Sequence, residues 1–189
     1  MVTNANIMLL SLVIGGLIIL VVFALLTYNA LVQLRNKVKE AFSTMDVYLK
    51  KRYDLIPNLV DVVKGYAKHE TDTLQNVTKM RENVQKGDLD TAIDSEVKIG
   101  DALQSLLVVV EKYPELKANT NFLDLQKNLS KMEEEIAFSR RYYNGSVREY
   151  NNKCQMFPFN LFAGILGFKA MPMYAVESDK ERQVVDVKL

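Results

Sequence analysis

The chain of 189 residues carries 24 Lys and Arg against 23 Asp and Glu, so its net charge is only +1. This balance gives no long-range field that would attract nucleic acid. One Cys allows no internal disulfide, and one His with one Cys cannot supply the four ligands that a structural zinc site usually takes. We therefore expect no nucleic-acid partner, no metal and no cofactor.

An uncharged apolar run opens the chain. The first 34 residues contain no Asp, Glu, Lys, Arg or His, and residues 7–26 are interrupted only by Ser11, Gly15 and Gly16. Roughly twenty helical residues span about 30 Å, which matches the hydrocarbon thickness of a bilayer. The run predicts a transmembrane helix over residues 7–28, after a short extracytoplasmic leader at residues 1–6.

Two other interpretations of this run fit less well. A cleaved signal peptide would need basic residues before a core of about 7–15 apolar residues and a small-residue site after it. Residues 1–6 contain no basic side chain, and the apolar core here is longer. A buried helix of a soluble protein is rarely apolar on all sides over such a length. We expect a retained membrane anchor.

Basic residues flank this run on one side only. Arg35, Lys37 and Lys39 lie within about 15 residues of its end, the range over which the positive-inside rule acts, and none precedes it. We expect the N-terminus outside and the rest of the chain in the cytoplasm. The alternative places the rest of the chain on the outer face.

Residues 29–156 have the pattern of long helices. Apolar side chains recur there at spacings of three and four residues, which is typical of helices that pack like coiled coils. The four predicted stripes are Leu31, Leu34, Val38, Ala41, Met45 and Tyr48; Leu59, Val63, Tyr66, Val77 and Val84; Leu89, Ile93, Val97, Leu103, Leu107 and Val110, with Gly100 among them; and Phe122, Leu125, Leu129, Met132, Ile136, Tyr143 and Tyr150.

Three breaks separate these predicted helices. Pro57 fits the first turn of a helix, so we expect the first helix to end there and the second to begin. The second helix should end at Gly87, and Asp88 can cap the third. The third helix should end near Pro114, and residues 119–121 can cap the fourth. Because the connections are short, neighbouring helices should run antiparallel. The predicted fold is all-α: an N-terminal transmembrane helix followed by an up-down antiparallel bundle of long helices.

A short apolar segment at residues 157–174 follows the bundle. Its large apolar side chains are Phe157, Phe159, Leu161, Phe162, Ile165, Leu166 and Phe168. The segment is too short to span a bilayer. It either folds back to cap the open end of the bundle, dips into the lipid interface as amphipathic segments do, or binds a protein. The polar tail at residues 175–189 should be loosely ordered or pair weakly.

Several stretches together resemble the LemA family of bacterial membrane proteins. They are residues 28–43, 52–60, 64–70, 111–119 and 140–144, with Phe157-Pro158, Asn160-Leu161 and Gly167-Phe168. The resemblance implies a single N-terminal membrane helix, a cytoplasmic helical bundle and no established enzymatic activity. A magnetosome membrane protein belongs to the same family, which hints at membrane-associated assembly in some members. The chain departs from the family at Phe42, where Trp is usual, and at residues 173–177, where Phe-Glu-Ala is usual.

Little in the sequence indicates catalysis. His69 stands beside Glu70, but a catalytic base needs a positioned partner and a pocket, so we expect a solvated helix residue. Cys154 is expected to be a packed or semi-exposed thiol, with palmitoylation near the membrane as the alternative. We expect no enzyme, although a deep pocket gathering three or more titratable side chains would favour one.

Polar residues also lie on or beside the predicted stripes. They are Arg35, Asn36, Asp46, Asn58, Arg140, Tyr143, Asn144 and Tyr150. They form either a hydrogen-bonded network that fixes helix register or a shared partner-binding face. Residues 133–135 are three consecutive Glu, which we expect to be a solvated helix face.

These observations favour a non-catalytic scaffold or adaptor in the bacterial cytoplasmic membrane. It would present helix faces to an unidentified protein partner or to a second copy of the chain. The alternative is a lipid-binding or membrane-remodelling protein that uses residues 157–168.

Overall fold

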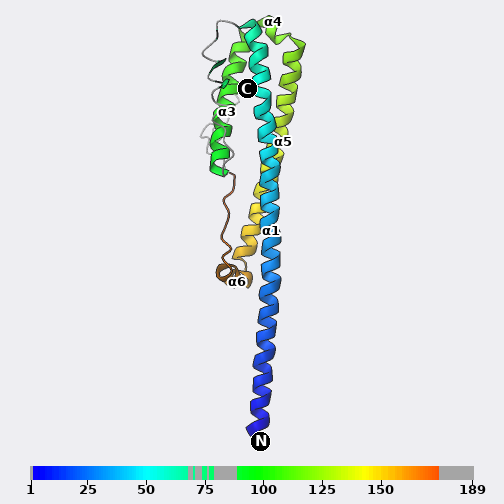
Figure 1. Cartoon of the computed structure of the whole chain (residues 1–189), viewed down its shortest axis with the longest axis vertical. Coiled ribbons are helices and arrows are strands. Elements are labelled where there is room, and N and C mark those ends of the chain that lie inside the picture. Colours follow the sequence, from blue (N-terminus) through cyan, green and yellow to red (C-terminus); the bar gives the residue numbers. More distant parts are fainter. Residues whose placement is uncertain (1, 68–69, 71–73, 76, 79–88, 175–189) are drawn as a thin grey trace, which may run out of the picture. The chain divides into compact units, whose positions relative to one another are not determined.

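The computed structural model describes residues 2–67, 70, 74–75, 77–78 and 89–174. Within these residues the regular secondary structure is entirely helical, which confirms the all-α prediction. The helices are α1 (Val2–Tyr66), α3 (Leu89–Glu111), α4 (Pro114–Lys117), α5 (Thr120–Gln155) and α6 (Phe159–Ile165) (Figure 1). Several predictions lie outside the described residues: those for His69, Val84, the break at Gly87 and Asp88, and the tail at 175–189.

The apolar run forms the first part of α1. Its side chains are widely exposed, including Leu12 at 76% and Met8 at 74%, as expected for a helix that meets lipid on all sides. Among the described residues, α1 is the one helix long and apolar enough to cross a membrane. The sequence prediction of a membrane-spanning helix therefore agrees with the structure.

The predicted helix break at Pro57 is wrong, because α1 continues through this residue to Tyr66. A proline inside a helix removes one backbone hydrogen bond and costs about 3 kcal/mol or more. Ile56, Leu59 and Val63 surround Pro57 and are almost completely buried. The packing of these side chains offsets the lost hydrogen bond, so Leu59, Val63 and Tyr66 belong to α1 and not to a second helix.

The chain divides into two compact units, and α1 and α5 each contribute to both. Unit 1 comprises Met1–Phe42 and Tyr142–Met173, and unit 2 comprises Ser43–Arg141 and Tyr174–Leu189. In unit 1, Phe42 packs against Tyr143 and Lys37 pairs with Glu149. As the residue number increases along α1, the number of its partner on α5 decreases. The two helices therefore run antiparallel, as predicted.

Unit 2 joins α1, α3, α4 and α5 around one core. Its most deeply buried side chains include Met45, Leu49, Ile56, Ile99, Leu106, Leu116, Phe122 and Ile136. Asn119 connects two of the helices: it accepts a hydrogen bond from the Phe122 N–H at 3.1 Å and donates one to the Tyr66 hydroxyl at 2.9 Å. The first bond confirms the predicted cap of the last long helix.

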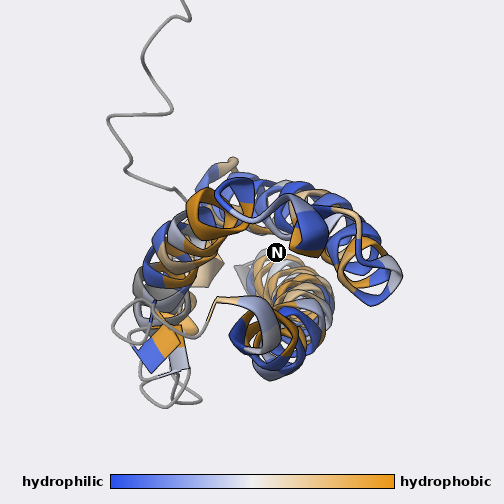
Figure 2. Cartoon of the chain, turned by 90° about the horizontal axis from the view of Figure 1, so that it is seen from above, coloured by the Kyte–Doolittle hydropathy of each residue, from blue (hydrophilic) through white to orange (hydrophobic). Residues whose placement is uncertain are grey.

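The buried face of α3 differs from the predicted stripe. Val97 and Leu107 are 42% and 40% exposed, whereas Ile99, Leu106 and Val109 are buried. A stripe with a period of 3.5 residues drifts around a helix that has 3.6 residues per turn, so a few positions decide which face is buried. Hydrophilic and hydrophobic residues alternate along the helices of the chain (Figure 2). Val97 and Leu107 lie beside a groove instead of in the core.

Candidate functional site

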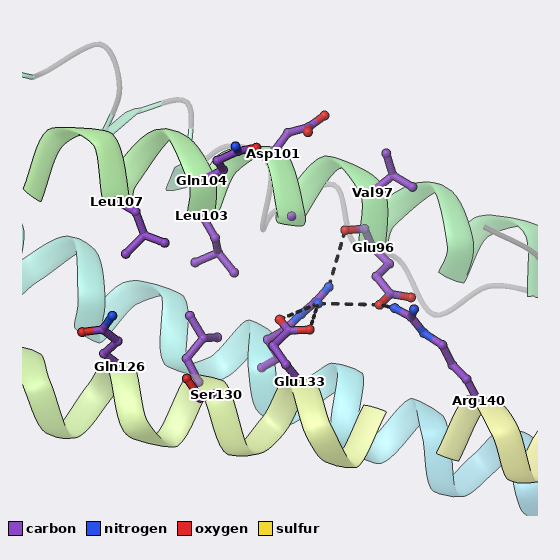
Figure 3. A pocket seen from close by; sticks show the side chains of 13 residues that line it. Glu96, Val97, Asp101, Leu103, Gln104, Leu107, Gln126, Ser130, Glu133 and Arg140 are labelled. Atoms are coloured by element: carbon purple, nitrogen blue, oxygen red, sulfur yellow. Dashed lines mark hydrogen bonds and ion pairs between the residues drawn. The ribbon is translucent and has the colours of Figure 1, made fainter. Parts of the chain in front are cut away.

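A groove of about 510 Å³ lies between α3 and α5 in unit 2. Leu103 and Leu107 of α3 point toward Gln126 and Ser130 of α5 across it (Figure 3). Leu129 adds a half-buried apolar side chain to the α5 wall. The groove therefore combines an apolar floor with neutral polar groups along its rim.

Four charged side chains from three helices close one end of this groove (Figure 3). Arg52 of α1 lies 2.9 Å and 3.1 Å from the two carboxylate oxygens of Glu133 on α5. Its Nη1 also lies 3.6 Å from Oε1 of Glu96 on α3, which in turn forms an ion pair with Arg140 of α5. We call Arg52, Glu96, Glu133 and Arg140 the charge cluster.

Two members of the charge cluster are deeply buried, whereas Arg140 and Glu133 are 25% and 46% exposed. The side chains of Arg52 and Glu96 are only 3% and 5% exposed. A charge at such a depth is tolerated only when partners compensate for its lost hydration. Each Arg of the cluster meets a Glu, so the two pairs neutralise one another. The cluster thereby favours one register among α1, α3 and α5, which is the structural role of a buried ion-pair network.

The groove gathers more titratable groups than the sequence suggested, since Asp101 joins the charge cluster in its wall. Such a gathering is what a catalytic site would need. The two Glu and two Arg of the cluster, however, are engaged with each other. Across the described residues, no three His, Cys, Asp or Glu side chains stand where they could hold a metal ion.

Three members of the charge cluster were missed by the sequence reasoning. Arg52 stands three or four residues from the buried Leu49 and Ile56, so a charge in an apolar seam was the available signal. Glu96 has the same relation to Ile99. Glu133 is 46% exposed, as a solvated helix face requires, but its carboxylate also binds Arg52.

The predicted polar residues do not gather into one network. Arg140 belongs to the charge cluster in unit 2, with its guanidinium 4.9 Å from the ring centre of Tyr174. Asn36, Asp46 and Asn58 are exposed, so they do not form part of a buried network, and a partner-facing role stays a prediction for them. Asn144 is half-buried.

Tyr143 and Tyr150 hold an extended segment against α5 in unit 1. The Tyr143 hydroxyl donates to the carbonyl oxygen of Pro172 at 3.1 Å, and the Tyr150 hydroxyl donates to that of Lys169 at 3.0 Å. Asn151 adds two hydrogen bonds of 2.9 Å to the backbone of Met171. We call residues 168–173 the strap. These hydroxyls therefore fix the return of the chain along α5.

Burial around the strap shifts two acid groups. It raises the pKa of Tyr150 to about 12, helped by a hydrogen bond with Cys154. Burial also raises the pKa of the Cys154 thiol, although the Tyr150 contact acts in the opposite direction. A buried thiol with a raised pKa forms little thiolate and is a poor nucleophile. This environment weighs against palmitoylation at Cys154.

The apolar segment after α5 packs against the membrane-spanning part of α1. The ring centres of Phe159 and Phe162 on α6 lie 5.7 Å and 5.4 Å from that of Phe23, which is inside the apolar run. Phe168 lies 5.7 Å from Tyr28, and the Arg35 guanidinium sits 5.3 Å from the Phe168 ring centre. The segment therefore sits at the end of the predicted span.

α6 and the residues on either side of it also present apolar side chains outward. Ile165 is 83% exposed, Phe157 is 77% exposed and Leu161 is 57% exposed, with Leu166 exposed beside them. Gly167 ends the helix with a φ of +76°, a conformation that glycine adopts without strain. Phe159, Phe162 and Phe168 face the protein, where they contact Phe23 and Tyr28 of the predicted span, so the capping and lipid alternatives both stay predictions.

Comparisons with known proteins place this architecture in a family. The sequence model of the LemA family matches residues 41–189. Protein LemA of Metamycoplasma hominis is 29% identical over 160 residues, which cover 84% of this chain and 73% of that protein. Magnetosome protein MamQ of Magnetospirillum gryphiswaldense is 24% identical over 194 residues, which cover 88% and 71%. Residues 1–40 lie outside the family match, so the membrane span rests on the apolar run itself.

Proposed function

Because the chain belongs to the LemA family, we propose that it is a non-catalytic scaffold anchored in the bacterial cytoplasmic membrane. In this proposal α1 supplies the anchor, with the N-terminus outside and unit 2 in the cytoplasm. The groove between α3 and α5 binds an amphipathic helix of a protein partner, through the helix-in-groove mode in which an apolar face fills a groove between helices.

The exposed part of the α3 face carries this proposal. Leu107 is 40% exposed at the groove, although a stripe of apolar residues along α3 would normally be buried. Leu103 and Leu129 continue the apolar surface inward, and Gln104 and Gln126 offer amide groups at the rim. The charge cluster closes one end of the groove and holds the two walls in register. A rigid groove of this kind loses little entropy when a helix binds.

Site-specific photocrosslinking tests the scaffold proposal. A photoreactive residue at Ser130, in the groove, should capture an amphipathic helical segment of another protein in cells. The same residue at Phe138 is the control, because Phe138 lies on α5 outside the groove lining and is 62% exposed. Leu107→Glu should abolish the Ser130 product without changing products from Phe138.

Three outcomes would contradict parts of this proposal. Equal products from Ser130 and Phe138 would show that the groove has no special role. A Ser130 product linked to a second copy of the chain would replace the partner protein with self-association. Turnover of a small molecule that is lost in Leu107→Glu would overturn the non-catalytic part.

The outward face of α6 supports a second function, contact with lipid. Leu161 and Ile165 are exposed on the helix that packs on Phe23, inside the predicted span, and Phe157 is exposed just before this helix. An apolar face at this depth gains free energy by entering the acyl-chain boundary. We propose that α6 lies in the membrane interface.

The chain contains no Trp, so a single introduced Trp reports its own surroundings. Leu161→Trp in nanodiscs should be quenched by lipids with brominated acyl chains. Phe138→Trp, in unit 2, should not be quenched. An unquenched Trp at position 161 would leave α6 outside the lipid and contradict this second function.

A further inference from the structure

Charge is distributed unevenly between the two units. Unit 1 contains six of the 24 basic residues and only two of the 23 acidic ones, so its net charge is +4 and that of unit 2 is −3. One of the two acids, Glu149, pairs with Lys37 at 2.7 Å. No Asp or Glu occurs from residue 150 to residue 173, which includes α6 and the strap. The protein surface next to the predicted span is therefore cationic.

Three cations lie at the level of α6. The Lys153 ammonium sits 3.4 Å from the ring centre of Phe159, which itself packs on Phe23. Arg35 covers the ring of Phe168. Lys169 follows Phe168 in the strap, where Tyr150 fixes its carbonyl oxygen and its side chain is exposed. Two of the cations thus contact protein-facing rings of the segment on which Phe157, Leu161 and Ile165 are exposed.

We propose that Arg35, Lys153 and Lys169 bind the phosphate groups of anionic phospholipids whose acyl chains lie against α6. Each element of such a lipid has a counterpart here: the apolar face of α6 takes the chains, and the cations take the headgroup. Basic residues beside a membrane span attract anionic lipid by about 1 kcal/mol each, which is roughly a fivefold enrichment per cation. This inference rests on the proposed lipid contact of α6 and adds the class of lipid.

The Trp reporter can measure this preference directly. The full-length Leu161→Trp protein is placed in nanodiscs with equal amounts of phosphatidylcholine and phosphatidylglycerol. In one preparation the phosphatidylcholine carries the brominated chains, and in the other the phosphatidylglycerol carries them. Stronger quenching from the brominated phosphatidylglycerol is expected, because that lipid should be enriched around residue 161. The difference should shrink as added salt screens the headgroup charges.

Charge variants identify the residues responsible. Lys153→Gln with Lys169→Gln should reduce the preference by roughly fivefold or more, while total quenching stays high. Lys127→Gln with Lys131→Gln removes two exposed charges of unit 2 and should change nothing. Lys153→Arg with Lys169→Arg keeps both charges and should retain the preference, which separates a loss of charge from a disturbed fold.

The possible results distinguish the two proposals. Equal quenching by both lipids would overturn the anionic-lipid site and leave the lipid contact of α6 intact. Quenching by neither lipid would overturn both. A preference that survives Lys153→Gln with Lys169→Gln would also overturn the assignment of these side chains to the headgroup.

Discussion

Phe23 and Phe159 stack with their ring centres 5.7 Å apart and their planes inclined by 25°. Phe23 belongs to the apolar run of α1, whereas Phe159 belongs to α6, which follows α5. The contact brings a segment that lies more than 130 residues later in the chain to the membrane-spanning helix. It is the geometric basis for placing α6 in the membrane interface.

Phe23→Ala should loosen α6. Phe23 makes two aromatic contacts with this helix, and each such pair contributes about 0.5–1.5 kcal/mol beyond area burial. Amide hydrogen exchange of residues 159–165 in nanodiscs should therefore accelerate at least several-fold. Val13→Ala is the matched control, because Val13 lies on the same span and is 55% exposed. Unchanged exchange in Phe23→Ala would show that these rings do not hold α6.

Glu96→Gln should destabilise unit 2. The Glu96 carboxylate faces both Arg52 and Arg140, and the Arg52 side chain is only 3% exposed. Removing the negative charge of Glu96 therefore leaves the buried positive charge of Arg52 with less compensation. Breaking a buried ion pair by removing one partner costs about 3–5 kcal/mol. The free energy of unfolding can be measured by denaturant titration in detergent.

The control for this prediction is Lys50→Gln. Lys50 pairs with Asp54 at 3.0 Å, but both side chains are more than half exposed. Exposed pairs contribute about 0–1 kcal/mol, so this variant should unfold almost as the parent does. Equal losses in the two variants would show that burial does not strengthen the charge cluster.

Tyr150 should make the protein sensitive to alkali. Its pKa is raised from 10.0 to about 12 in the folded state, so folding favours the protonated phenol. The resulting stabilisation is fully present below pH 10 and is lost as the pH rises toward 12. Tyr150→Phe should reduce the slope of this part of the stability profile, and part of the slope should remain because burial also raises the pKa values of Tyr53 and Tyr143. At neutral pH it should cost about 1 kcal/mol, because the hydrogen bond to the Lys169 carbonyl is lost.

The matched variant is Tyr142→Phe, since Tyr142 is 42% exposed. At neutral pH it should cost less stability than Tyr150→Phe does, and the two variants are compared from pH 10 to pH 12. Unfolding titrations at each pH, together with phenolate absorbance, measure both effects. A parent protein whose stability is constant over this interval would contradict the assignment to Tyr150.

Cys154 should react slowly while the protein is folded. Its side chain is buried, and burial raises the pKa of the thiol, so the reactive thiolate is scarce near pH 8. Labelling by a maleimide should be much slower in the native state than after unfolding. Gln155→Cys in a Cys154→Ser background provides an exposed thiol one residue away. Equally fast labelling of both thiols would refute the protected environment.

A reporter fused after Leu189 should reveal the orientation. Arg35, Lys37 and Lys39 follow the apolar run and no basic residue precedes it, so a cytoplasmic fluorescent protein should fold and emit. Alkaline phosphatase at the same position should be inactive. Replacing the three cations with Gln should mix the orientations. Active phosphatase on the parent chain would place the bundle on the outer face.

The sequence by itself determined the features that depend on local pattern. An uncharged run of sufficient length can satisfy its backbone within a helix and its side chains in lipid, so the span was predictable. Apolar residues spaced three and four apart predicted the helices. The capping role of Asn119 was also predictable, because a cap needs only neighbouring backbone groups. Short sequence motifs also sufficed to identify the resemblance to the LemA family, and the family match confirmed it.

Only the tertiary structure decided the features that depend on contacts distant in the chain. Burial of Ile56 and Leu59 carries α1 through Pro57, although local propensity predicts a break. The same kind of packing chose which face of α3 is buried and paired Arg52 with Glu96 across helices. The spacing of residues in the sequence shows which side chains share a helix face. The free energy that pairs such a side chain with a residue of another helix comes from the contacts between the two helices. For this reason the groove and the packing of α6 on Phe23 could be identified only from the tertiary structure.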